Sequence, residues 1–276
     1  MKLSLSILDN QQQVKLGRND YEEEDKPMQA SGEDFVDLAT QDFAYEDGDS
    51  IKVEVDEPDV YLVAKLDETL DSSLVYVKGK IWEYKIAMTE NAYEARPDKR
   101  FASKRHYLSV RAATPEEIKS YRNWALNPHD QKEENGAYPH AHANVETRND
   151  ATFFACNAID GVYANLSHGS YPYVSWGINR QEDAALTIDF GRKVTLDKVA
   201  FTLRSDFPHD NFWEKVTVAF SDGTSEEFHT VKTNVRQVFD FSKRTVDSVK
   251  FYQLIKSADE SPFPALTQIE FFGRNV

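Results

Sequence analysis

Short stretches of alternating apolar and polar residues recur along the first part of the chain. In the first stretch, Leu3, Leu5 and Ile7 occupy every second position. A period of two is typical of β-strands that bury one face. Turn-forming residues such as those at 78–80 separate one stretch from the next. We predict further strands at 51–55, 60–66, 74–77, 81–86 and 106–111, which together indicate an antiparallel β-sandwich.

The alternation stops at a helix-start signal. Thr114 is placed to cap a helix, Pro115 suits its first position, and Glu117 completes a capping box. This pattern predicts a short helix that ends before Pro128. The polar segment that follows reads as a linker, so a domain boundary is expected here.

Alternation returns in the second half of the chain. Turn residues at 190–192 and 221–224 separate the apolar runs. Few runs occur between 139 and 183, where a long loop region indicates a functional rim. We therefore predict an all-β protein with two β-sandwich domains joined by one short helix: residues 1–113, a helix and linker at 114–138, and residues 139–276. The strands expected in the second domain are 185–190, 199–203, 216–220, 227–231, 238–241, 249–255 and 267–272.

Charge and cysteine content narrow the class of protein. The net charge of −15 leaves no basic surplus for nucleic acid or an anionic membrane, and no window is long and apolar enough for a membrane span. Cys156 is the single cysteine, which excludes an internal disulfide, and its apolar neighbours predict an inert buried thiol. The first residues lack the apolar core of a signal peptide, so a soluble cytoplasmic protein is expected. The sequence does not indicate an oligomeric state.

Residues 204–213 hold the densest group of polar and aromatic side chains in the second half. The segment lies between two predicted strands, and Pro208 interrupts the ladder, so we expect a loop. Loops on a rigid β scaffold are common positions for recognition residues. The side chains of interest in it are Arg204, Asp206, His209, Asp210 and Trp213.

Several motifs of the second half resemble a known family. The run 157–161 ends in Asp160-Gly161, Ser175-Trp176 follows, and an alternating strand then ends at Gly191. A glutamate, Glu270, follows an aliphatic residue near the carboxyl end. This pattern is similar to that of discoidin-like, galactose-binding-like domains, and it covers about residues 140 to 274.

The resemblance implies an eight-stranded jelly roll whose loops at one end bind a ligand, most often a carbohydrate. It also implies a structural calcium ion, held by backbone carbonyls of the Asp-Gly loop and by the side chains of Asp160 and Glu270.

The loops of the second domain contain the side chains that sugar recognition needs. Aromatic faces cover the apolar side of a sugar ring, while charged and amide groups bond to its hydroxyls. In a jelly roll, alternate loops emerge at the same end, so these side chains are expected to converge. The predicted ligand-binding residues are Arg204, Asp206, His209, Asp210, Trp213, His168, Tyr173, Trp176, His140 and Arg148.

Several of the candidate site residues also have a purely structural interpretation. Trp176 and Trp213 can fill the core, since tryptophan buries most of its surface. Arg204 can form an ion pair within its own loop, and His140 can lie in a solvated loop. Asp160 can serve a simple turn. The combination of carboxylates and imidazole in 206–210 suits a transition metal, but its spacing matches no metal signature.

The sequence contains none of the common catalytic motifs. It has no nucleophile elbow, no zinc-protease helix and no phosphate-binding glycine loop. We therefore predict a carbohydrate-binding protein that does not change its ligand. Two alternatives stay open: a glycoside hydrolase or lyase with its site between the domains, for which Asp206 and Asp210 would be the carboxylates, and a protein–protein interaction module.

Overall fold

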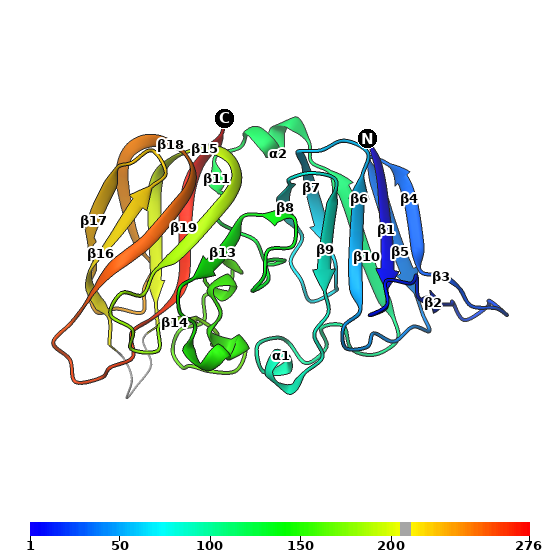
Figure 1. Ribbon diagram of the computed structural model, residues 1–276, viewed down its shortest axis with the longest axis horizontal. Coiled ribbons are helices and arrows are strands. Elements are labelled where there is room, and N and C mark those ends of the chain that lie inside the picture. Colours follow the sequence, from blue (N-terminus) through cyan, green and yellow to red (C-terminus); the bar gives the residue numbers. More distant parts are fainter. Residues whose placement is uncertain (205–210) are drawn as a thin grey trace.

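The computed structural model describes residues 1–204 and 211–276, and it shows two β-sandwiches side by side (Figure 1). The predicted fold class is confirmed. Helices α1 (Glu90–Glu94) and α2 (Pro115–Lys119) lie at opposite ends of the junction between the sandwiches. Neither they nor any other helix in the described ranges has the length and apolar character to cross a membrane.

The first sandwich consists of two antiparallel sheets around one apolar core. Leu3, Leu5 and Ile7 of the first strand are buried and the residues between them are not, as the alternation predicted. Trp82 lies fully buried in the same core. One sheet has the order β4 (Gln29–Glu33), β1 (Lys2–Leu8), β6 (Ser50–Val55), β9 (Ile81–Lys85), and the other β12 (Ala137–Tyr138), β8 (Ser73–Val77), β7 (Val60–Lys65), β10 (His106–Ala112), β5 (Phe35–Thr40). A short ribbon pairs β2 (Leu16–Gly17) with β3 (Lys26–Pro27).

The second sandwich is built on long strands that bend. β15 pairs with β18 and β19 on its two sides, and its register shifts where the chain bends. The main strand order is β11 (Arg122–Asn123), β19 (Ala265–Asn275), β15 (Leu186–Leu203), β18 (Gln237–Lys256), β16 (Trp213–Phe220), β17 (Ser225–His229), with β13 (His140–Ala143) on β15 and β14 (Trp176–Gly177) on β19. The 3-10 turns η1 (Thr147–Asn149), η2 (Ala151–Phe153) and η3 (Ala155–Ile159) fill the rim predicted as a long loop region.

The predicted helix is present but shorter than expected. Its capping box is formed: the Thr114 hydroxyl accepts a hydrogen bond from the Glu117 amide, and the Glu117 carboxylate accepts one from the Thr114 amide. The helix ends at Lys119, and residues 122–123 pair with β19 instead of continuing it. The prediction of a helix to residue 127 is therefore wrong, because residues 122–123 form a strand paired with β19.

The predicted turn at 190–192 is also wrong. β15 continues through it, with a register shift between Asp189 and Val194. Gly191 has a φ of 70°, and a Cβ there would lie 2.6 Å from the ring of Tyr138. The glycine thus bends one strand and lets the linker pack closely, instead of joining two strands.

The linker connects both sandwiches through hydrogen bonds. Residues 122–123 pair with β19 of the second sandwich, while residues 137–138 pair with β8 of the first. The Tyr61 hydroxyl also donates to Asn275 Oδ1 across the junction, at 2.6 Å. The two sandwiches are therefore joined by hydrogen bonds at their interface.

Candidate functional site

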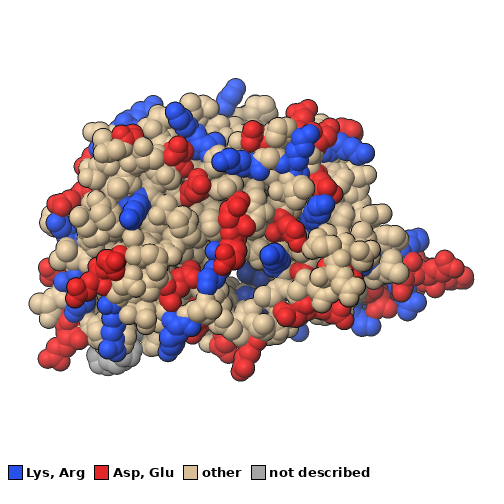
Figure 2. All heavy atoms as spheres, in the orientation of Figure 1, with Lys and Arg blue, Asp and Glu red and all other residues tan. Residues whose placement is uncertain are grey.

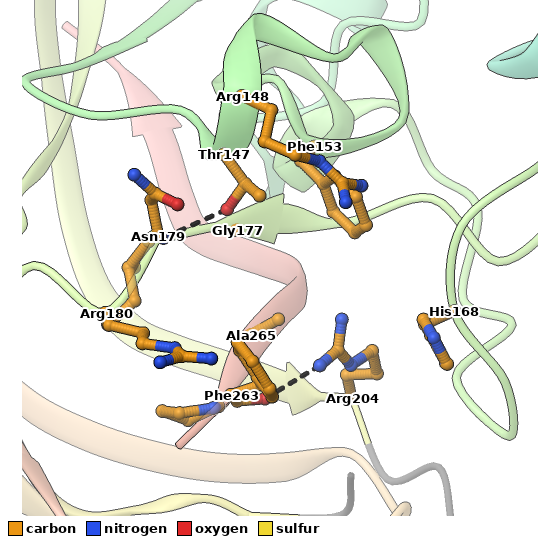
Figure 3. Close-up of a pocket in the computed structure, with 12 residues that line it drawn as sticks. Thr147, Arg148, Phe153, His168, Gly177, Asn179, Arg180, Arg204, Phe263 and Ala265 are labelled. Atoms are coloured by element: carbon orange, nitrogen blue, oxygen red, sulfur yellow. Dashed lines mark hydrogen bonds between the residues drawn. The ribbon is translucent and has the colours of Figure 1, made fainter.

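A pocket opens at the end of the second sandwich where β15 ends and β19 begins (Figure 3). Its volume is about 230 Å³. The lining comes from η1 and η2, from the loop around residue 168, from β14 and the segment after it, from the residue just after β15, and from the start of β19 with the segment before it. The lining residues are Thr147, Arg148, Phe153, His168, Gly177, Ile178, Asn179, Arg180, Arg204, Phe263, Pro264 and Ala265.

Close backbone packing shapes one wall of this pocket. A Cβ on Gly177 would lie 2.7 Å from the Thr147 hydroxyl and 3.1 Å from the Phe153 ring, so only glycine fits without displacement. The backbone amide of Asn179 donates to that same hydroxyl at 2.9 Å. The segments around residues 147 and 179 are thereby locked together.

Two pairs of neighbouring residues on this wall have left-handed backbones. Arg148 and Asn149 have φ values of 56° and 54°, and Asn179 and Arg180 have values of 48° and 62°. Such conformations are uncommon outside glycine and cluster at ligand-binding sites. Three of the four residues line the pocket.

The pocket is rich in cationic side chains. Arg148, Arg180 and Arg204 reach it from three different segments, and Figure 3 shows His168 on the same side as Arg204. Among its described lining residues there is no aspartate or glutamate. The chain as a whole has a net charge of −15, so this cluster of positively charged hydrogen-bond donors is a local feature of the pocket.

Each arginine is held by a defined contact. Arg204 is buried, with 6% of its surface exposed, and donates through Nη2 to the carbonyl of Phe263 at 2.7 Å. The guanidinium of Arg180 lies 4.5 Å from the ring centre of Phe263. Arg148 lies 5.7 Å from the ring of Phe153 and pairs with Asp150 at 3.3 Å. The aromatic rings thus orient the charged groups.

The structure brings together three of the residues predicted from the sequence, namely Arg148, His168 and Arg204. Tyr173 is partly buried and lies outside the lining. The predicted residues Asp206, His209 and Asp210 lie outside the described residues.

The two tryptophans expected to stack on a sugar are core residues. Trp176 and Trp213 are fully buried, with their ring centres 6.4 Å apart. The indole of Trp176 donates to the carbonyl of Val145 at 2.9 Å. Neither ring offers a face to a ligand, so the stacking prediction is wrong for both.

His140 is also corrected. It is buried at the junction, where its Nδ1 lies 2.8 Å from Asp130 Oδ1. Burial lowers the pKa of His140, but the hydrogen bond and charge of Asp130 outweigh it, so the net pKa is raised. This histidine holds the linker and does not reach the pocket.

The residues proposed for calcium do not fit the ion as they stand. Asp160 Oδ1 accepts hydrogen bonds from Val162 N at 2.8 Å and from Gln268 Nε2 at 2.6 Å. Gln268 Nε2 also donates to the carbonyl of Asn157 at 2.6 Å, so an amide group stands where a cation would meet these oxygens.

The second proposed ligand is engaged elsewhere. The Glu270 carboxylate accepts from the Tyr163 hydroxyl at 2.9 Å and from Arg236 Nε. Burial raises the pKa of Asp160 to about 7. Calcium binding here stays a prediction, and the described contacts do not support it.

Several lining residues were missed at the level of sequence. Weak sequence signals existed for Asn179, Arg180 and Phe263. Asparagine tolerates left-handed backbone, and Phe263 stands between two prolines in a loop. Phe153 and Thr147 gave none, because their role depends on packing against Gly177.

The chain was compared with known proteins. No protein-family model and no curated protein matches it. Similar solved structures include chitosan-binding module 1 of a chitosanase/glucanase from Paenibacillus sp. IK-5, with 18% identity, 55% of this chain and 98% of that chain covered, and a TM-score of 0.39.

Two further neighbours are a galactose complex and a fucose-binding module. The family 32 carbohydrate-binding module of C. perfringens NanJ, in complex with galactose, has 19% identity, covers 48% of this chain and 91% of its own, and has a TM-score of 0.37. A Streptococcus pneumoniae fucose-binding module has 15% identity, 55% and 98% coverage, and a TM-score of 0.40. These three neighbours are carbohydrate-binding modules, the kind of domain that the sequence resemblance predicted.

Proposed function

We propose that this protein binds carbohydrate, without changing it, in the pocket at the end of β15. The observation that supports this most directly is the convergence of three arginines, an asparagine and two phenylalanines from separate segments on one concave surface. Guanidinium and amide groups bond to hydroxyls, and an aromatic ring covers the apolar face of a sugar.

Phe263 takes the role that the tryptophans were expected to have. It is partly exposed, and its carbonyl and ring are already fixed by Arg204 and Arg180. A ring fixed in this way loses little conformational freedom when a ligand binds. The ligand's hydroxyls then meet donors from the arginines and acceptors from the Asn179 amide.

The size of the pocket limits the ligand. A volume of about 230 Å³ lies below the roughly 300 to 1,000 Å³ typical of sites for drug-sized molecules. One sugar ring, or the end of a chain, is therefore the expected unit. Each hydrogen bond adds only about 0.5 to 1.5 kcal/mol, so micromolar to millimolar affinity is expected.

A glycan-binding screen with matched variants tests the proposal. Arg180 is exposed at the rim, so Arg180→Gln should leave the fold intact while removing a charge-assisted donor. We expect a loss of affinity of about tenfold for the best glycan, measured by calorimetry. Lys243→Gln, an exposed change on the same domain outside the pocket lining, should bind as the wild type does.

Two results would contradict the proposal. One is the absence of any glycan bound above background by the folded wild type. The other is a glycan whose affinity is the same in the wild type and in Arg180→Gln combined with Asn179→Ala. Release of cleaved sugar on long incubation would instead favour the hydrolase or lyase alternative.

A further inference from the structure

A second, larger cavity lies between the two sandwiches. Its volume is about 620 Å³, and its walls come from β9, α1, the linker and the turns η2 and η3. Figure 2 shows a hollow in this part of the surface, with Lys or Arg atoms visible inside it. The cavity belongs to neither domain alone and shares no lining residue with the pocket described above.

Arg96 is the unusual residue of this cavity. It is buried, with 8% of its surface exposed. Its Nη1 donates to the carbonyl of Ala87 at 2.8 Å, and its guanidinium lies 4.6 Å from the ring centre of Tyr93. Nε and Nη2 are buried and have no hydrogen-bond partner within the described residues. A buried, unpaired donor pair is costly and calls for an explanation.

The two unpaired donors of Arg96 have a geometry that suits a ligand with two oxygens. Nε and Nη2 are on the same edge of the guanidinium plane and form the side-on fork that matches two oxygens of a carboxylate or phosphate. Burial lowers the pKa of Arg96, and the neighbouring tyrosines Tyr84 and Tyr93 offset this only in part. No ion pair between Arg96 and a carboxylate occurs in the described part of the chain.

A second arginine lies at the same cavity. Arg100 donates from Nε to the Thr69 hydroxyl at 3.0 Å and from Nη2 to the Thr69 carbonyl at 3.4 Å. It faces the cavity beside Arg96, and the two positive charges repel one another. Two neighbouring guanidiniums without a carboxylate partner favour an anion between them.

The acids of the cavity are engaged elsewhere or exposed. Asp130 accepts from His140 Nδ1 and from the Ala141 amide, both at 2.8 Å. Glu134 accepts from the Tyr138 hydroxyl at 3.1 Å, and Glu83 from the Gln12 amide at 3.2 Å. Glu133 is exposed on the linker.

We propose that the cavity between the sandwiches binds a small organic anion, whose carboxylate or phosphate oxygens accept hydrogen bonds from Nε and Nη2 of Arg96. Arg100 adds charge to the site, and the rings of Tyr84 and Phe101 give it an apolar wall. Because η2 and η3 of the second sandwich also line the cavity, a bound anion is expected to stabilise the junction. This site is independent of the proposed sugar pocket.

Thermal unfolding of the full chain tests the site. The probes are inorganic phosphate and citrate at about 10 mM, each compared with sodium chloride at the same ionic strength. For a dissociation constant near 1 mM, the better probe should raise Tm by about 3 °C above chloride. A larger shift with phosphate assigns a phosphate ligand, and a larger shift with citrate assigns a carboxylate.

Variants identify the residue responsible. Arg96→Gln should abolish the shift and weaken binding at least tenfold in calorimetry, and Arg96→Lys, which keeps the charge but not the fork, should also weaken it. Arg105→Gln, an exposed change in the same sandwich, and Arg180→Gln in the sugar pocket should keep the full shift.

The outcomes decide the proposal in every case. If Arg96→Gln does not fold, the wild-type titration and Arg96→Lys still test it. The proposal is overturned if neither probe exceeds chloride, or if the Arg96 variants that fold bind as tightly as the wild type.

Discussion

At the scale of single residues, Asp160 is a carboxyl group whose pKa is strongly altered by its environment. Burial raises its pKa to about 7 from an ordinary 3.8. The folded state therefore favours the neutral acid, and the stabilisation from this group is complete below about pH 4 and lost as pH rises through 7. Its acceptor oxygen, Oδ1, is used by Val162 N and by Gln268 Nε2.

Asp160→Asn should stabilise the protein at pH 8 and not at pH 4. Asparagine keeps the acceptor oxygen and removes the charge, so the free energy of unfolding at pH 8 should rise by roughly 1 to 3 kcal/mol. Urea unfolding at the two pH values measures this. Asp98→Asn, an exposed change, serves as control. A loss of stability at pH 8 would show that the folded protein uses the charged carboxylate.

At the scale of elements, the side chain of Gln268 links β19 to η3 and to the Asp160-Gly161 loop that follows it. Gln268 donates to Asn157 O and to Asp160 Oδ1, and its Oε1 accepts from Gly161 N at 3.0 Å. Asp160 was expected to bind calcium here. The Gln268 amide bonds to its carboxylate instead.

Gln268→Ala should therefore destabilise the protein, while calcium should not stabilise the wild type. The substitution leaves the Asn157 carbonyl and the Gly161 amide without the Gln268 partner and removes one of the two donors to Asp160 Oδ1, at a cost of roughly 2 to 4 kcal/mol in the free energy of unfolding. Gln11→Ala in an exposed loop is the control. Thermal unfolding with 5 mM calcium and with EDTA should agree within about 1 °C. A rise of several degrees with calcium would restore the metal site at Asp160 and Glu270.

Elements were predictable from the sequence to the extent that local pattern determines them. Alternation identified β1, β6, β7 and β10, and the capping box identified the start of α2. The end of α2 was not predictable, because distant pairing with β19 fixes it. Strand β5 was missed although its own sequence alternates, with Val36 and Leu38 buried between exposed neighbours.

The candidate site was harder to predict from the sequence than the strands were. Arg148, His168 and Arg204 were predictable because polar residues in loops of one sandwich end tend to meet. The roles of the aromatic residues were not, since Trp213 and Phe263 are both aromatic and differ in burial, which the sequence does not show. Burial depends on the whole packing arrangement, which residue spacing does not reveal.

At the scale of the whole molecule, Arg192 joins the two sandwiches. It comes from the bend of β15, and its guanidinium lies 5.4 Å and 5.2 Å from the ring centres of Tyr61 and Tyr76 in the first sandwich. The ring of Trp124, from the linker, is 5.0 Å away. One cation therefore contacts three rings from parts of the chain that are far apart in sequence.

Arg192→Ala should uncouple the two sandwiches. Each cation–π contact of a desolvated group contributes about 0.5 to 2 kcal/mol, so a loss of roughly 2 to 4 kcal/mol in the free energy of unfolding is expected. Differential scanning calorimetry should show one transition in the wild type and two in the variant, since each sandwich keeps its own core. The exposed neighbour Lys193, changed to alanine, should leave one transition. Two transitions already present in the wild type would show that the sandwiches unfold independently and that Arg192 does not couple them.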